Sequence, residues 1–463
     1  MMKKAIIIIG MALAVLLSAC ADWVNVSPKE EVEAEKLFNS ENGFKSALIG
    51  VYARMTLKKN YGKNLSYGYI EELAQRYDNY DAVAAPTDAK RAERYDYKNN
   101  KDAKTYVDGL WVELYNTIAN LNSLLSHLEN GGRDIVLTEG LWEQIKGEAL
   151  GLRAFHYFDL LRLYGPVYSK NPEMKCLPWR TEFNSVRLPL VSASEIAGHI
   201  LDDLEEAESL LTDGSLEDVR VRDRKHRMNR MAVKALMARV YLWTGDKKNA
   251  AIKAKEVIDE CGLKLARTNL EDVSLFEETI FALGMDDMKE ELKNDWADIT
   301  IYSNEYYISL ENARSVFEYS TVGVNDIRYR AGYGFIHGTN GLLCRKYLGK
   351  SVLYAEKIPL IRLSEMYYIL AESVELSGSE DYLNAVRNTR GISRNYNLSF
   401  KSESERIEAL NKEYQKDFFA EGQWFYFLKR HDYPTFHRCP VGRMVYYVLP
   451  TPDDEIAYGT GDE

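Results

Sequence analysis

The sequence GEALGLRAFHYFDLLRLYGPV, residues 147–167, predicts a long helix that is buried on more than one side. Its apolar side chains recur at spacings of three and four, as a helix with a buried face requires. One stripe is Ile145, Ala149, Leu152, His156, Leu160 and Leu163, and a second is Ala154, Phe158 and Leu161. A helix that is apolar on two sides lies between neighbours. We expect it to span residues 144–164 and to stop at Gly165-Pro166.

The same periodicity predicts helices on both sides of this stretch. Ser192-x-x-Glu195 is a capping box, which opens a helix over residues 192–211. Residues 231–260 are typical of an antiparallel helix pair, with Gly245 at the turn and Asp246 as the second cap. The small residues of that pair are typical of a tetratricopeptide unit of about 34 residues. Further helices are expected over residues 42–57, 105–128, 360–376 and 382–390.

Two long stretches, residues 58–104 and 263–357, lack this periodicity and are rich in Tyr, Gly, Asn and Asp. Irregular segments of such length inside a compact protein are usually functional. We expect them to be binding insertions with a few short strands, for example over residues 299–302. The helices around them predict an all-α-dominated chain.

The amino terminus is typical of an exported protein. Lys3 and Lys4 precede an apolar run over residues 6–17, and small Ser18 and Ala19 precede Cys20. This run is too short to span a bilayer, which takes roughly 20 apolar residues. It therefore predicts a cleaved signal peptide over residues 1–19. A secretory signal with a chance cysteine is the alternative to a lipid-modified Cys20.

Composition excludes some classes of partner. The chain of 463 residues has a net charge of -11, and removing Lys3 and Lys4 makes it more negative. Such a charge argues against nucleic acid or anionic lipid as the main partner. No later segment has the length of a membrane-spanning helix, so the lipid on Cys20 would be the only membrane attachment.

The remaining cysteines, Cys176, Cys261, Cys344 and Cys439, are far apart and show no metal-type spacing. Four cysteines allow three pairings, and the sequence does not choose among these or free thiols. We expect them to be mostly buried as small apolar residues. The histidines likewise show no metal-ligand spacing, and no cofactor is indicated.

Six elements, in order behind the cysteine, resemble the SusD/RagB family of outer-membrane nutrient-binding lipoproteins. The strongest is residues 147–167, with its Leu-Arg-Ala, Tyr-Phe-Asp-Leu and Arg-Leu-Tyr-Gly-x-Val parts. The others are FNSENGFKSALIGVYARM (38–55), Trp111-x-x-x-Tyr115-x-x-Ile118, IPLIRLSEMYYILAE (358–372), LNAVRNTRGI (383–392) and FAEGQWFYFLKR (419–430), the last followed by Leu449-Pro450-x-Pro452. The resemblance spans nearly the whole chain.

The resemblance implies a single domain over residues 20–463, with about four tetratricopeptide-like helix pairs and a loop-built binding face. It also implies a surface-facing outer-membrane lipoprotein that captures an oligosaccharide and passes it to a TonB-dependent transporter. Peptide-binding members of the family are the alternative. The family's loops vary most where ligand binds, so the resemblance is weakest in the two insertions.

The candidate ligand contacts are Tyr77, Asp78, Asn79, Tyr80 and Asp81. Aromatic rings can stack on the C–H groups of a sugar, while carboxylates and amides bind its hydroxyls. The alternative is a solvated turn with packed tyrosines. Further candidates, for which core packing is the more frequent fate, are Tyr95, Tyr97, Trp296 and Tyr302.

Three other charged features favour structural roles. The acidic run at residues 286–298 lacks the spacing of an EF-hand loop and fits a solvated helix face better than a calcium site. The basic run at residues 220–230 fits a solvated linker. Arg153 and Asp159, inside a helix that is apolar on two sides, are expected to be paired structural ions.

Two rival functions compete with that of a binding lipoprotein. A glycoside hydrolase needs only two carboxylates, but no pair is marked as catalytic, and no nucleotide-binding or hydrolase motif is present. A tetratricopeptide scaffold for a periplasmic protein would have short turns, whereas this chain has long tyrosine-rich insertions. We therefore expect a binding protein that is not an enzyme.

Overall fold

The computed structural model describes most of the chain after the amino-terminal segment. The described residues are 34–78, 95, 97, 100–216, 224–267, 271–285, 288, 306–330, 332–338, 341–349, 351, 353–439 and 445–459. The predicted signal peptide, Cys20 and the predicted strand over residues 299–302 lie outside them.

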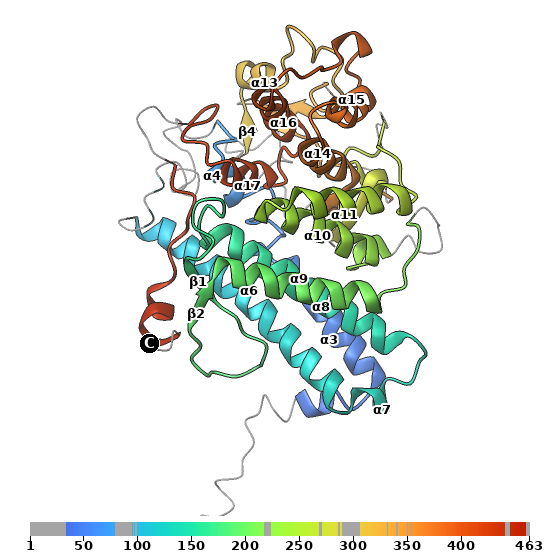
Figure 1. The fold of residues 1–463 in the computed structure, drawn as a ribbon, viewed down its shortest axis with the longest axis vertical. Helices are drawn as coiled ribbons and strands as arrows, with labels where there is room; N and C mark the ends of the chain where they lie inside the picture. Colours follow the sequence, from blue (N-terminus) through green and yellow to red (C-terminus); the bar gives the residue numbers. More distant parts are fainter. Residues whose placement is uncertain are drawn as a thin grey trace, which may run out of the picture.

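Four helix pairs form the body of the protein in the part of the chain that the structure describes. The pairs are α8 (Leu141–Tyr164) with α9 (Ala193–Leu210), α10 (Arg230–Thr244) with α11 (Lys247–Glu260), α14 (Leu363–Ser373) with α15 (Ser379–Thr389), and α16 (Glu403–Asp417) with α17 (Gln423–Arg430). Successive pairs touch through α9 and α10, α11 and α14, and α14 and α16. Figure 1 shows them stacked along the long axis, with α3 (Glu41–Met55) and α6 (Lys101–His127) beside α8. The predicted helix-pair scaffold is confirmed.

Helix α8 is the central element of this stack. Every residue from Gly147 to Tyr164 is buried. A methyl group at Gly147 would lie 2.8 Å from the Leu211 side chain, and one at Gly151 would lie 2.6 Å from that of Met228. These two glycines therefore let neighbouring segments approach α8 more closely than any larger residue would.

The charged residues of α8 are paired, as the sequence predicted. Arg153 donates two hydrogen bonds to Asp203 of α9, at 2.8 and 2.7 Å, and a third to Asn122 of α6 at 3.1 Å. Asp159 accepts a bond from the Tyr61 hydroxyl at 2.5 Å and is paired with Arg162. These contacts fix the orientation of α8 relative to its neighbours.

The capping and turn residues at the helix ends also have the roles that the sequence predicted. The Ser192 side chain accepts from the amide of Glu195, and the Asp246 side chain accepts from that of Asn249. Gly245 has φ 88°, a left-handed conformation that favours glycine between α10 and α11.

Short strands connect the irregular parts to the helices. Strand β1 (Lys175–Pro178) pairs with β2 (Leu190–Ser192), and β3 (Thr279–Gly284) pairs antiparallel with β7 (Lys357–Arg362). In a third sheet, β6 (Leu342–Cys344) lies between β4 (Tyr307–Ile308) and β5 (Phe335–His337). The remaining elements are α4 (Tyr69–Leu73), η1 (Leu128–Gly132), α7 (Arg133–Ile135), η3 (Phe276–Glu278), α13 (Leu310–Val316), η5 (Arg394–Tyr396) and η6 (Glu455–Gly459).

Some predicted helix starts are wrong: the helices expected from residues 105 and 382 begin at Lys101 and Ser379, and another begins late because a strand precedes it. The helix expected from residue 360 begins at Leu363, because residues 357–362 form strand β7. Isoleucines at positions 358 and 361 suit a strand, and pairing with β3 satisfies its backbone.

A buried ionic cluster, here called the Asp417 cluster, joins the carboxyl-terminal helices to the strands. Its members are Glu278, Asp326, Arg328, Lys346, Arg362, Arg387, Arg390, Glu413, Lys416, Asp417 and Glu421. Arg362 donates to Glu278 at 2.8 Å and to Asp417 at 2.9 Å, and Arg390 donates to the same two carboxylates at 2.6 and 2.9 Å. Both arginines are fully buried, so these contacts replace water entirely.

Acid is expected to destabilise the protein through this cluster. Burial alone would raise the pKa of Asp417, but Arg390, Arg362 and Arg328 hold it well below its usual range. The pKa of Glu413 is lowered in the same way. As the pH falls, the unfolded chain takes up these protons first. The stability that the cluster contributes is therefore present above about pH 4.5 and is lost below it.

Urea unfolding at a series of pH values measures this effect. The midpoint should fall steeply between about pH 5 and pH 3. Burial raises the pKa of Glu71 and Asp203, so these two groups act in the opposite sense to Asp417 and Glu413. A urea midpoint that stays constant over this pH range would contradict the conclusion that the Asp417 cluster stabilises the protein through its ionised carboxylates.

Cys176, Cys261 and Cys344 are buried free thiols, and Cys439 is half-buried and also free. Burial raises the pKa of Cys176 to about 12 and that of Cys344 to about 11. The prediction that the cysteines mostly serve as small apolar residues is confirmed.

Candidate functional site

The predicted ligand contacts fall into two groups. Tyr77, Asp78, Tyr95 and Tyr97 are described, whereas Asn79, Tyr80, Asp81, Trp296 and Tyr302 lie outside the described residues.

The three described tyrosines belong to the core. Tyr77 has no exposed surface, and its ring lies 4.6 Å from that of Tyr306. Its hydroxyl donates to a backbone oxygen at 2.6 Å, and burial raises its pKa. Tyr95 and Tyr97 are also buried, and their hydroxyls donate to backbone oxygens at 2.8 and 3.2 Å. Each ring is packed and each hydroxyl is bonded, which fits the alternative of packed tyrosines for Tyr77 and the more frequent fate, core packing, for Tyr95 and Tyr97.

Asp78 holds the two insertions together. Its amide donates to Tyr307 at 2.8 Å, and its carboxylate accepts from the Asn312 side chain at 2.7 Å. The Ser309 amide and the Arg438 guanidinium also donate to this carboxylate. Residue 78 of the first insertion thus lies against β4 and α13 of the second. With these partners, the carboxylate positions the chain.

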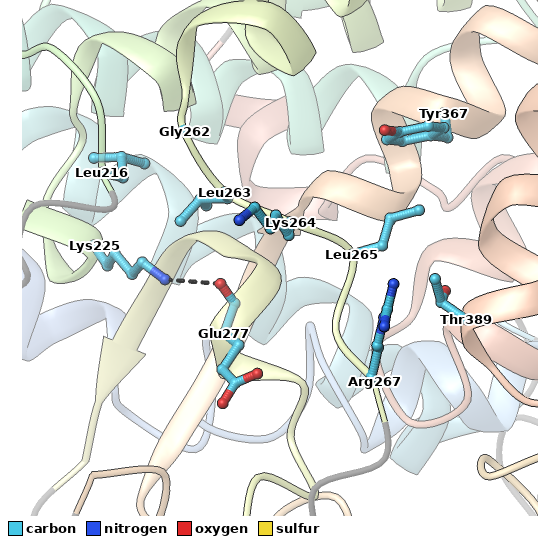
Figure 2. Close-up of a pocket in the computed structure, with 10 residues that line it drawn as sticks. All are labelled: Leu216, Lys225, Gly262, Leu263, Lys264, Leu265, Arg267, Glu277, Tyr367 and Thr389. Carbon is cyan, nitrogen blue, oxygen red and sulfur yellow. Dashed lines mark hydrogen bonds between the residues drawn. The ribbon is translucent and has the colours of Figure 1, made fainter.

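One cavity lies beyond the end of α11 and has a volume of about 730 Å³. Figure 2 shows Lys225 and Glu277 facing Arg267, Thr389 and Tyr367 across it. The buried Lys225 ammonium donates to the backbone oxygens of Phe276 and Glu277, each at 3.1 Å. The lining has three basic side chains and one aromatic ring, so it lacks the paired rings and amides that suit a neutral sugar.

A second cavity, here called the aromatic groove, has a volume of about 550 Å³. It lies between α6, the connection from β1 to β2, and η6, which is near the carboxyl terminus marked in Figure 1. Trp111, Tyr115 and Phe183 line it, with Val112 and Asn116. The rings of Trp111 and Tyr115 are 4.9 Å apart, and the Phe183 side chain is 59% exposed. An exposed ring beside fixed rings is suited to stacking on a sugar.

Polar groups surround these rings. The Asn184 amide donates to Glu182 at 2.6 Å, and the Arg180 guanidinium lies 3.7 Å from the Glu455 carboxylate. The exposed Asn116 side chain adds a further amide on the rim. Amides, carboxylates and a guanidinium can bind sugar hydroxyls while the rings contact C–H groups.

The loop that carries Phe183 is held in place from both sides. The Asn122 and Tyr157 side chains donate to the backbone oxygen of Arg180, each at 2.9 Å, and the Arg180 guanidinium donates to Val186 at 2.7 Å. The groove is therefore a formed feature of the fold, built from three segments far apart in the sequence.

The sequence pattern did not predict the groove. It places Trp111 and Tyr115 on a helix, where their spacing of four puts both rings on one face, but it does not say what that face meets. Phe183 comes from a loop with no periodic signal.

Two family models together match most of the chain. Residues 22–242 match a family described as starch-binding and associating with the outer membrane, and residues 293–455 match the SusD family. The chain belongs to the SusD/RagB family.

Individual SusD-like relatives are distant. The chain is 24% identical to SusD-like protein P38 of Formosa agariphila over 57% of its own length, and 25% identical to a SusD-like protein of Bacteroides ovatus over 59%. In each case the match spans 47% of the relative, about half its length.

Solved SusD structures show the same fold. A SusD-like carbohydrate binding protein of Bacteroides vulgatus superposes with a TM-score of 0.70 at 19% identity, over 91% of this chain and 97% of that one. A SusD superfamily protein of Bacteroides fragilis gives 0.70 at 21% identity, over 91% and 99%. The likeness confirms the predicted SusD-like fold class.

Metal binding and membrane crossing both lack support in the described part of the chain. Among the described residues, no group of histidine, cysteine and acidic side chains could hold a metal ion. No helix that the structure describes combines the length and the apolar character needed to cross a bilayer.

Proposed function

We propose that this protein is a surface-facing outer-membrane lipoprotein that binds an oligosaccharide and passes it unchanged to a TonB-dependent transporter. The observation that carries the proposal is the match of both halves of the chain to SusD family models, one described as starch-binding. The similar structure from Bacteroides vulgatus is that of a carbohydrate binding protein, which supports the same ligand class.

Two surfaces are candidates for the sugar. The first is the paired insertions, with Asn79, Tyr80, Asp81, Trp296 and Tyr302 as proposed contacts. Asp78 supports this choice, since it ties the first insertion to the second.

The second candidate is the aromatic groove. Its exposed Phe183 ring, fixed neighbouring rings and polar rim have the chemistry of a sugar site. The two candidates predict different effects of substitution.

Affinity gels that contain a panel of soluble glycans, soluble starch among them, test the proposal. The wild-type protein should be retarded by at least one glycan. Tyr80→Ala should weaken retention by about tenfold if the insertions bind, since stacking on one aromatic ring is worth about 1 kcal/mol or more. Phe183→Ala should weaken retention to a similar extent if the aromatic groove binds the glycan. Both variants should keep the wild-type melting temperature.

Tyr396→Ala is the matched control, because this tyrosine is 48% exposed and lines neither candidate surface. Reducing ends are measured in the same samples. Retention without their release supports a binder, whereas steady release of reducing ends would show a hydrolase. Failure of every glycan, with a peptide retained instead, would overturn the ligand class.

A further inference from the structure

A small pocket lies where five helices of the scaffold meet. Residues of α8, α10, α14, α16 and α17 line a volume of about 30 Å³. That volume is about the share of one water molecule in the liquid, and it also fits one halide ion. Gln423 and Arg430, on the α17 side, are half-buried, so this side lies toward the surface.

Three of the residues that line this cavity each have a buried donor with no hydrogen-bond partner among the described residues. These donors are Nη1 of Arg239, Nε1 of Trp243 and the hydroxyl of Tyr426. Their residues are only 6%, 5% and 4% exposed. Buried polar groups are almost always bonded, so three unpartnered donors around one small cavity indicate a common ligand.

The lining favours a ligand that accepts hydrogen bonds without donating them. Both oxygens of the lining carboxylate, Glu365, already accept from Arg239, at 2.6 and 2.5 Å. The lining amide oxygen of Gln423 accepts from Arg162 at 3.1 Å. Burial raises the pKa of Tyr426, so its hydroxyl remains a donor at neutral pH.

The charged groups of the lining also favour an anionic ligand. Three guanidiniums, of Arg162, Arg239 and Arg430, line the cavity together with one carboxylate, Glu365. Arg162 and Arg430 have their own carboxylate partners outside the lining, Asp159 and Glu372. Among the lining residues the three guanidiniums outnumber the one carboxylate, and with Asp159 and Glu372 the wider cluster has three charges of each sign.

We propose that this cavity binds one halide-sized monovalent anion, such as chloride, through Arg239 Nη1, Trp243 Nε1 and the Tyr426 hydroxyl. The ion links α10 to α17 and lies beside α8, α14 and α16. It is a stabilising ligand of the scaffold, and its site is separate from both candidate sugar surfaces.

Thermal unfolding in sodium chloride and in sodium gluconate of equal ionic strength tests the proposal. Gluconate is too large for a cavity of about 30 Å³. The wild-type Tm should be higher in chloride, by about 2 °C when the ion is at tenfold its Kd. The double variant Trp243→Phe/Tyr426→Phe should lose this difference, because it removes two donors and keeps an aromatic ring at each position.

Tyr368→Phe is the matched control. Its hydroxyl is also buried and unpartnered among the described residues, but it does not line the cavity. This variant should keep the wild-type dependence on chloride. Equal loss in both variants, or a wild-type Tm that does not respond to the anion, would overturn the proposal.

Crystals grown in bromide give a direct readout. An anomalous peak within hydrogen-bond distance of the three donors is the expected result. Ordered water without anomalous signal at this place would show that the cavity takes water instead and would also overturn the proposal.

Discussion

Asp417→Asn is expected to lower the free energy of unfolding by about 3–5 kcal/mol, the cost of breaking a buried ion pair. The Asp417 carboxylate accepts from Arg390 at 2.9 Å, from Arg362 at 2.9 Å and from Ser364 at 2.8 Å. Asparagine keeps the shape but removes the charge that compensates two fully buried guanidiniums. Urea unfolding followed by circular dichroism measures the loss.

The control is Asp259→Asn on the surface of α11. Asp259 pairs with Lys255 at 2.5 Å, but both side chains are more than half exposed. Exposed pairs contribute little, so the urea midpoint should stay at the wild-type value. If Asp417→Asn had an equally small effect, the Asp417 cluster would not be a major source of stability. Asp417→Asn should also make the urea midpoint depend less on pH below about pH 5, because it removes the carboxylate whose pKa is strongly lowered.

Cys20→Ala is expected to move the protein from the membrane fraction to the soluble fraction, with at least about a tenfold change in the ratio. Acyl chains bind a membrane in proportion to their buried CH₂ groups, and two or more give stable attachment. No described helix offers an alternative span. Immunoblots of separated membrane and soluble fractions measure the change.

Cys439→Ala is the matched control, since Cys439 is a half-buried free thiol far from the signal sequence. It should leave the distribution unchanged. Mass spectrometry of the wild-type amino terminus should show an acylated Cys20. An unmodified residue, or a Cys20→Ala protein that stays with the membrane, would rule out the lipid anchor.

Local chemistry explains which parts of the fold could be predicted. Helices α9, α10 and α11 carry caps and turns in the sequence itself, at Ser192, Gly245 and Asp246. Strand β7 carries no such signal, because a short apolar run fits a strand or a helix equally well. Its partner β3 lies some 70 residues earlier, so only the tertiary fold determines that this run forms a strand and not a helix.

The candidate site was less predictable for a related reason. Tyrosine has an apolar ring and a polar tip, so it suits a ligand surface and a core equally well. Tyr77 and Tyr95 are in the core because backbone oxygens lie within reach of their hydroxyls, which composition does not reveal. Phe183 and Trp111 meet only after three distant segments fold together.

The glycines of α8 also limit how the scaffold can move. At Gly147 and Gly151, neighbouring side chains occupy the space that a methyl group would need. Advancing α8 by one residue along its helical screw would bring Glu148 and Leu152 into those positions and cause a steric clash. The helix stack therefore resists shear as a rigid frame. A shift of α8 would therefore require the Leu211 and Met228 side chains to move with it.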